Sequence, residues 1–197
     1  MSTSEVGAEF LASYLTRLQA AISELDPMSL LRLAEAIDRT VAEGRQVLLL
    51  GNGGSAATAG HYVNDLVMAY GRTGRVARVR SLTDNPALIT GIGNDYSFAE
   101  IFTFQLRASG GPGDLAIAIS ASGNSPNLLA GIEQAQALGM TTAAIVGFDG
   151  GRLAELCDIV VHAATGVGDY GPAEDLHLIV NHAIAGLLYA RGVAATS

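Results

Sequence analysis

Short runs of apolar residues alternate with helical segments along most of this chain. Each run ends near a glycine or serine, and we expect strands at residues 47–50, 76–82, 115–119, 142–146 and 159–161. Helices are expected between and after them, at about 56–70, 86–92, 98–108, 127–138, 152–156 and 173–190. This alternation is typical of a parallel sheet wound with helices. The pattern therefore predicts an α/β fold.

Two further helices are expected before the first strand. Residues 10–25 carry apolar side chains at helical spacing and so present one apolar stripe. A second helix is predicted over 26–42, with Pro27 in its first turn and Gly44 near its end. Neither carries a titratable pair that suggests chemistry, so we assign both to packing or oligomer contacts. Without a linker or repeat, the chain is treated as one domain, 1–197, with N-terminal helices in 1–44 and an α/β core in 45–197.

Composition narrows the class of protein. A chain of 197 residues, 49% hydrophobic and 15% charged, is long enough for one substantial core. No stretch approaches the ~18 uninterrupted apolar residues of a membrane helix, and the N-terminus does not resemble a signal peptide. We therefore expect a cytoplasmic protein with no membrane partner. The single cysteine, Cys157, excludes an intramolecular disulfide and a thiolate-dominated metal site.

The net charge limits the ligands. It is −8, and the eleven basic residues, all arginines, form no basic run, so a nucleic-acid partner is not expected. An acidic protein must bind an anion locally, through backbone N–H groups, hydroxyls and helix N-termini. Turns rich in glycine and serine suit that purpose.

Two such turns follow predicted strands and open predicted helices. Their sequences are Gly51-Asn52-Gly53-Gly54-Ser55 and Ser120-Ala121-Ser122-Gly123-Asn124-Ser125. Glycine lets the backbone approach an oxyanion, and serine offers a hydroxyl or a helix cap. Neither turn fits a dinucleotide or nucleoside-triphosphate motif, so no organic cofactor is expected. Because ligands of open α/β sheets bind outside the carboxyl ends of the strands, the turns predict a site for a small oxygenated anion.

Histidines and carboxylates on two helices are candidates for chemistry. His61 and Asp65 are four residues apart, so they face the same way on a helix. Taken alone, such a pair is more often a surface or capping interaction. Glu174 and His182 on the last helix are ~12 Å apart along its axis and meet one ligand only if both lean toward it. For His177, between them, the alternative is a buried histidine with satisfied hydrogen bonds.

At these residues the chain resembles the SIS (sugar isomerase) domain family, specifically the phosphoheptose isomerases, which interconvert sedoheptulose 7-phosphate and D-glycero-D-manno-heptose 7-phosphate. The resemblance covers about residues 10–188, and its marks are the two turns, the His-bearing last helix, and the segments Ile92-Gly93-Asn94-Asp95-Tyr96 and Gly147-Phe148-Asp149-Gly150-Gly151. It implies a three-layer α/β/α sandwich with a five-stranded parallel sheet. It also implies a homotetramer with active sites between subunits.

The resemblance also implies a substrate site for a sugar phosphate. Serines contact the phosphate, namely Ser55, Ser120, Ser122 and Ser125, and Asn52, Gly53, Asn94 and Asp95 contact the sugar. Gly54, Ala121 and Glu174 complete the set of implied substrate-binding residues. Ala121 stands where the family usually has Thr, so one hydroxyl is missing. Without the family, Asn94 and Asp95 would be assigned to a turn and a helix cap.

A zinc and acid/base cluster is implied at His61, Asp65, Glu174 and His182. Asp65 would remove the proton beside the carbonyl, and His182 would move protons on the oxygen side. Asp65 replaces the family's Glu and is one methylene shorter, whereas Glu174 replaces Gln and adds a charge.

Two other functions stay open. One is isomerisation of a different phosphorylated ketose, and the other is a non-catalytic SIS protein that senses a phosphosugar or binds a partner protein. Both histidines and an acidic group at each remaining cluster position favour an enzyme. The glycine-rich segment 165–172 is expected to be a mobile loop over the site, from which Tyr170 could reach the substrate, although Tyr170 is not counted among the site residues.

Overall fold

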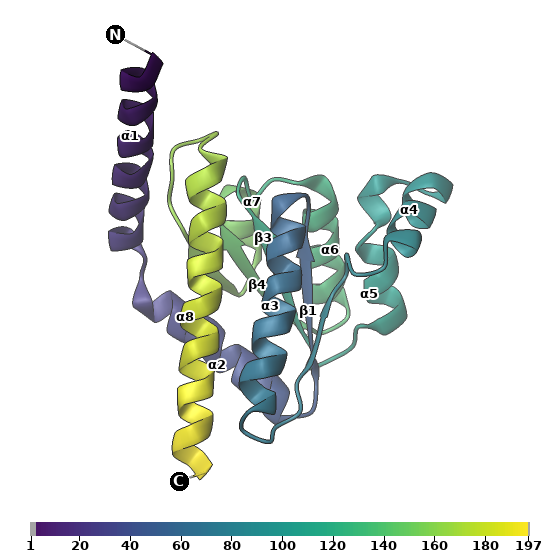
Figure 1. The fold of residues 1–197 in the computed structure, drawn as a ribbon. Helices are drawn as coiled ribbons and strands as arrows, with labels where there is room; N and C mark the ends of the chain where they lie inside the picture. The colour runs from purple at the N-terminus through teal and green to yellow at the C-terminus, as the bar shows by residue number, and fades with distance from the viewer. Residues whose placement is uncertain (1–2, 197) are drawn as a thin grey trace.

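A computed structural model describes residues 3–196, whose strands form one parallel sheet with helices on both faces (Figure 1). The strands are β1 (Gln46–Gly51), β2 (Arg78–Ser81), β3 (Leu115–Ser120), β4 (Thr141–Val146) and β5 (Ile159–His162). The helices are α1 (Thr3–Glu24), α2 (Pro27–Ala42), α3 (Gly54–Gly71), α4 (Pro86–Asp95), α5 (Thr103–Ser109), α6 (Pro126–Ala137), α7 (Gly151–Leu156) and α8 (Tyr170–Thr196), with a 3₁₀ turn η1 (Phe98–Glu100). The predicted fold class is confirmed.

The order of the strands brings the two predicted turns together. The sheet runs β2-β1-β3-β4-β5, so β1 and β3 are neighbours although β2 separates them in sequence. Leu50 lies opposite Ala118, and Gly51 lies opposite Ile119. From β1 the chain adds β2 on one side of the sheet and then β3 on the other, so the strand order reverses between β1 and β3. A ligand crevice is expected at such a switch point. Both turns open into it.

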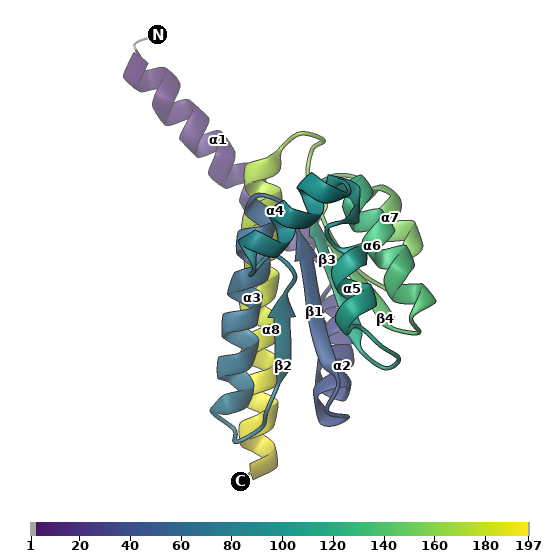
Figure 2. The ribbon, with the colours of Figure 1, turned by 90° about the vertical axis from the view of Figure 1, so that its right-hand side faces the viewer.

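Successive strand residues point into two separate cores. Leu49 and Ile117 face the layer formed by α2, α3 and α8, whereas Leu50 and Ala118 face α5, α6 and α7. Figure 2 shows α3 and α8 on one side of the strands and α5, α6 and α7 on the other. Each fully buried Leu or Ile contributes ~1.5–3 kcal/mol, so the two cores hold the sheet rigid beneath the turns.

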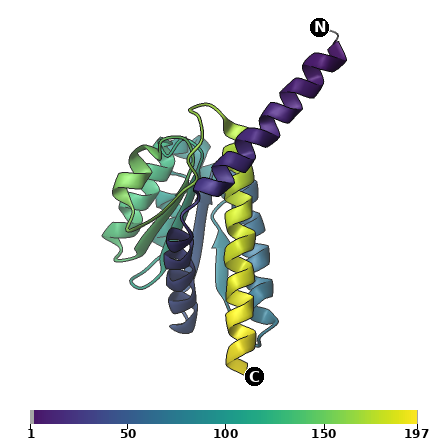
Figure 3. The same cartoon turned by 90° about the vertical axis from the view of Figure 1, so that its left-hand side faces the viewer.

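Helix α1 projects away from the body of the molecule (Figure 3). Its predicted apolar stripe is present, but Phe10, Leu11 and Leu15 are each more than 60% exposed. Of the α1 residues described, Ala21 alone is buried. The stripe is therefore left uncovered within a single chain.

Helix α8 is a core helix. Residues Tyr170–Ala195 are long and apolar enough to cross a membrane by length and composition. The same is true of core helices, and α8 packs along α3 with six apolar side chains buried: Ala173, Leu176, Val180, Ile184, Ala185 and Leu188. That packing accounts for the apolar side chains on the buried face of α8.

Two predicted segments differ from the structure. Residues 98–108 are not one helix, because the chain turns at Ile101 and Phe102, which are buried, and Thr103 donates to the Glu100 carbonyl at 3.1 Å. Residues 165–172 are not all loop, because α8 begins at Tyr170. Pro172 in its first turn is compatible with a helix start, since the N–H it lacks would have no helical partner there.

His177 of α8 is fully buried, and neither of its ring nitrogens has a hydrogen-bond partner of good geometry among residues 3–196. Burial, opposed in smaller part by the backbone of Val146, lowers the pKa of His177 to about 4. The predicted alternative of a satisfied buried histidine is therefore right about the burial and wrong about the hydrogen bonds.

We therefore expect the protein to lose stability in mild acid. In the unfolded chain a histidine has a pKa of ~6.5, so between pH 6.5 and pH 4 the unfolded state binds the proton more tightly. The free energy of unfolding should fall by about 3 kcal/mol from pH 7 to pH 4 on account of His177 alone. Urea titrations of the wild type and His177→Leu measure this as the difference between their pH slopes. Parallel slopes would contradict the assignment.

Candidate active site

A polar cavity of about 150 Å³ lies where β1 and β3 end. It is lined by the β1–α3 turn, the β3–α6 turn and the start of α8, through Asn52, Ser55, Ile119, Ser120, Ala121, Ser122, Ser125, Leu128, Tyr170 and Glu174. We call it the serine pocket. It brings together most residues that the sequence assigned to substrate binding, and Gly53 stands beside it as the N-cap of α3.

Hydrogen bonds within and between the turns fix the serine pocket. The Ser120 hydroxyl accepts from the Gly123 N–H at 3.0 Å. Asn52 and Asn127 exchange two amide hydrogen bonds of 2.9 Å each, which tie one turn to the other. Asn127 was not predicted as a site residue. The available signal was its place at the start of α6, directly after the second turn.

The carboxylate of Glu174 lies against the first turn of α3. A Cβ atom added at Gly54 would come within 2.4 Å of a Glu174 oxygen, so any larger residue there would displace the carboxylate. Negative charge is favoured beside a helix N-terminus. Gly54 therefore makes room for Glu174 in the serine pocket, which explains one glycine of the first turn.

His61, Asp65 and His182 form a second group, on the facing surfaces of α3 and α8. His61 Nε2 is 3.2 Å from Asp65 Oδ2, and His182 Nε2 is 3.7 Å from that oxygen and 3.3 Å from His61 Nε2. One potential ligand atom from each of the three lies within 4.8 Å of the others. Two imidazoles and a carboxylate suit Zn²⁺ and leave a fourth position open for water or substrate. The three residues can hold a metal ion.

Two amides orient the Asp65 carboxylate. Asn64 donates to Oδ1 at 2.9 Å, and Asn181 donates to Oδ2 at 2.6 Å. Asn181 is fully buried, and its own Oδ1 has no hydrogen-bond partner among residues 3–196. Neither amide was predicted as a site residue: Asn64 is a sequence neighbour of Asp65 and carries no motif, and the contact of Asn181 depends on how α8 packs on α3.

The cluster of four expected from the sequence is divided in the structure. Glu174 lines the serine pocket, whereas the metal-ligating group found in residues 3–196 contains only His61, Asp65 and His182. Eight residues separate Glu174 from His182, which is ~12 Å along a helix. Since the Glu174 carboxylate rests against Gly54, it stays near the N-terminal end of α8 and does not join His182.

Asn94 and Asp95 do not line the serine pocket of their own chain. Both are exposed at the end of α4, where Asn94 donates to Asp95 at 2.9 Å. Helix α4 lies at the same end of the sheet as the two turns (Figure 2). Within one chain these residues therefore lie in the last turn of α4, next to its cap residue Tyr96, close to the predicted alternative of a turn and a helix cap.

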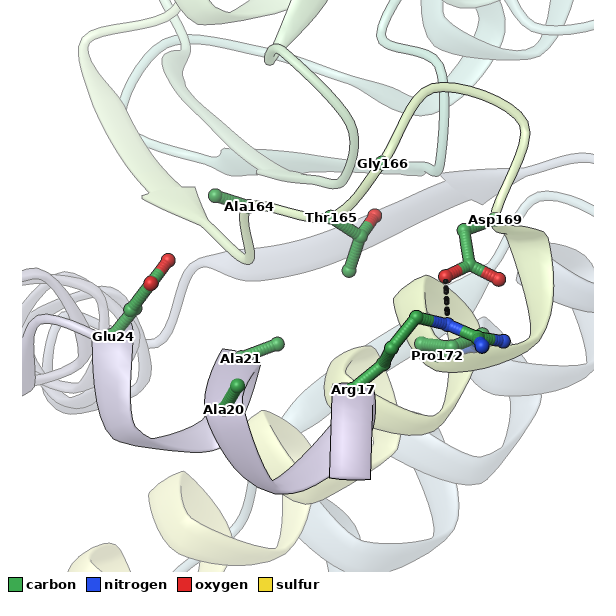
Figure 4. Close-up of a pocket in the computed structure, with 9 residues that line it drawn as sticks. All are labelled: Arg17, Ala20, Ala21, Glu24, Ala164, Thr165, Gly166, Asp169 and Pro172. Atoms are coloured by element: carbon green, nitrogen blue, oxygen red, sulfur yellow. Dashed lines mark hydrogen bonds and ion pairs between the residues drawn. The ribbon is translucent and has the colours of Figure 1, made fainter. Parts of the chain in front are cut away.

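A larger cleft of about 380 Å³ separates α1 from the chain before α8 (Figure 4). Its cation, Arg17, is paired with Asp169 at 2.9 Å. Small or uncharged side chains make up most of its remaining lining, with Glu24 at one end. Thr165 is the one hydroxyl residue among the described residues that line the cleft, whereas four serines line the serine pocket, which is therefore the better anion site.

Comparison with known proteins decides the family. The sequence pattern of the SIS domain matches residues 9–147. The phosphoheptose isomerase of Burkholderia pseudomallei is 39% identical over 159 residues, which are 80% of this chain and 79% of that protein. The chain belongs to the SIS domain family and, within it, to the phosphoheptose isomerases.

Solved structures agree with this assignment. A phosphoheptose isomerase from Neisseria gonorrhoeae has a TM-score of 0.83 and 29% identity over 95% of this chain and 98% of that one. Another from Francisella tularensis has a TM-score of 0.82 and 25% identity over the same shares. The family, the fold and the enzyme class predicted from the sequence are confirmed: this is an aldose–ketose isomerase of the sugar-phosphate type.

Proposed function

We propose that this chain interconverts sedoheptulose 7-phosphate and D-glycero-D-manno-heptose 7-phosphate through an enediol or enediolate. The observation that carries the proposal is that helix α3 contributes residues both to the serine pocket and to the group of His61, Asp65 and His182. Ser55 lies in the first turn of α3 and His61 lies six residues further on, a rise of ~9 Å. A long phosphosugar anchored at the serine pocket can therefore reach toward His61, Asp65 and His182.

The serine pocket would hold the phosphate. Ser55, Ser120, Ser122 and Ser125 supply hydroxyls, and the first turn of α3 adds N–H groups that favour an anion. Asn52, Gly53 and Gly54 would contact the sugar near this end, together with Glu174. The binding is local, as an acidic protein requires.

The reacting carbons would lie at the second group. Asp65 is proposed to remove the proton beside the carbonyl, and its orientation is supported by the hydrogen bonds from Asn64 and Asn181. His182, half exposed, would move protons on the oxygen side. A zinc ion held by His61, Asp65 and His182 would, when bound, stabilise negative charge developing on the substrate oxygens.

We also propose a cytoplasmic homotetramer, with 1–197 as a single SIS domain. The exposed stripe of α1 supports assembly, because a large uncovered apolar surface usually marks a contact with another molecule. Asn94 and Asp95 face solvent in one chain, which fits a role in a site shared between subunits. Sedimentation velocity would test this, and a monomer at micromolar concentration would contradict it.

Solvent exchange tests the class of reaction. In deuterated water, deuterium should enter sedoheptulose 7-phosphate at the carbon beside the carbonyl, and faster than it enters shorter ketose phosphates. The reason is that only a sugar with a long carbon chain reaches from the serine pocket to His61, Asp65 and His182. Mass spectrometry of the recovered sugars measures the incorporation. Tight binding without exchange of any sugar phosphate would contradict an isomerase and favour a phosphosugar sensor.

A further inference from the structure

We propose that Tyr170 binds the substrate's phosphate, its phenol hydroxyl replacing the hydroxyl that Ala121 lacks. This rests on the proposed function for the presence of phosphate in the serine pocket. Tyr170 and Ala121 line that pocket together, with Ser120 and Ser122 beside them. A phenol O–H can donate to a phosphate oxygen as a threonine O–H does, and hydrogen bonds to a charged group are the stronger kind.

The alanine at position 121 has a structural consequence. Ala121 packs with Phe148 and Ala173 in a small buried apolar cluster that joins the β3–α6 turn, the β4–α7 turn and α8. All three side chains are less than 9% exposed. A hydroxyl at position 121 is accommodated only where it points into the serine pocket, because on the side of this cluster it would be an unpaired polar group. The same substitution that removes a hydroxyl from the pocket thus provides an apolar surface for Phe148.

Phe148 is held in an uncommon backbone conformation. Its φ of +43° lies in the left-handed region, which is rare for a large side chain. The Phe148 N–H donates to the Thr165 hydroxyl at 3.2 Å, and its carbonyl lies 2.9 Å from His162 Nε2. Such conformations persist where the surroundings determine them. The turn therefore fixes the direction of the Phe148 ring.

That ring positions Tyr170. The two rings meet edge to face, with centroids 5.0 Å apart and an interplanar angle of 76°, an arrangement that aromatic pairs prefer. The preceding residue, Asp169, is paired with Arg17 of α1 (Figure 4). Tyr170 is 57% exposed, so its hydroxyl is accessible to a ligand. A ring packed on Phe148, at a helix start that the Arg17–Asp169 pair restrains, loses less freedom when phosphate binds than an unsupported side chain would.

Tyr170 also shares a helix face with Glu174, which is four residues further on and lines the same pocket. The Glu174 carboxylate would repel a phosphate, and an additional hydroxyl donor offsets part of this repulsion. The first two turns of α8 thus supply the serine pocket with a donor as well as a charge.

The test is the affinity of the Tyr170→Phe variant for inorganic phosphate, because this change removes the hydroxyl and keeps the ring. Isothermal titration should show a dissociation constant raised about 5- to 20-fold. For isomerisation, KM should rise by a similar factor while kcat changes less than twofold. Tyr189→Phe is the control, since Tyr189 is another exposed tyrosine of α8 that does not line the pocket. Its phosphate affinity should be unchanged.

A rescue variant distinguishes the hydroxyl from the fold. Adding Ala121→Thr to Tyr170→Phe returns a hydroxyl to the pocket and should recover at least part of the lost affinity. Phosphate affinity in Tyr170→Phe equal to that of the wild type, or a wild type that binds no phosphate, would overturn the proposal. Because phosphate titration needs no turnover, a wild type that binds phosphate but isomerises no sugar would refute the proposed function while Tyr170 is still tested.

Discussion

Replacement of His182 by alanine is expected to lower deuterium exchange into sedoheptulose 7-phosphate by at least ~100-fold, the usual range for a lost acid or base. His182 Nε2 lies 3.7 Å from the Asp65 carboxylate and 3.3 Å from His61 Nε2, so its loss removes both a proton carrier and one of three metal donors. Its side chain is 56% exposed, and the core does not depend on it.

The same variant should retain the serine pocket. Titration with inorganic phosphate is expected to give a dissociation constant within about twofold of the wild type, because the hydroxyl donors are untouched. Zinc affinity, measured by chelator competition, should fall. Ala190→Ser, an exposed change on α8, serves as the control and should alter none of the three. Full exchange activity in His182→Ala would remove His182 from the mechanism.

Replacement of Gly123 by alanine is expected to cost about 2–4 kcal/mol of stability and to weaken phosphate binding. Gly123 has a φ of +63°, and a Cβ there would lie 2.0 Å from the Gly150 carbonyl oxygen, so the backbone must shift. The Gly123 N–H also donates to the Ser120 hydroxyl, and the shift would therefore move a proposed phosphate ligand.

Denaturant titration measures this cost. Gly91→Ala in α4 is the matched control, because no atom lies within 4 Å of the added methyl. That change should stabilise the protein by roughly 0.5–1 kcal/mol, as alanine does in a helix interior. Equal stabilities for the wild type and Gly123→Ala would contradict the close approach of the β3–α6 turn to the β4–α7 turn at Gly150.

The elements of the fold were predictable because each depends on local pattern. Buried strands such as β1 and β3 are continuous apolar runs, and Pro27, Pro86 and Pro126 mark helix starts. The predictions for residues 98–108 and for the start of α8 were wrong because the burial of Phe102 and the contacts of Tyr170 are tertiary interactions. A local pattern does not contain them.

The site was predictable only as two turns and a helix pair. The sequence places Ser55 and Ser120 after strands, but their approach depends on the strand order, in which β1 and β3 are neighbours. Glu174 leaves the expected cluster because its carboxylate rests against Gly54, a contact between residues 120 positions apart. Asn127, Asn181 and Phe148 act through partners on other elements, so none carries a motif of its own.

The most direct test of the central claim is conversion of sedoheptulose 7-phosphate by the zinc-supplied protein, followed by ³¹P and ¹³C nuclear magnetic resonance. We expect D-glycero-D-manno-heptose 7-phosphate to appear and the same equilibrium mixture to form from either sugar, with no conversion by His182→Ala. Saturable binding of sedoheptulose 7-phosphate without any conversion by the wild type would contradict the proposed function.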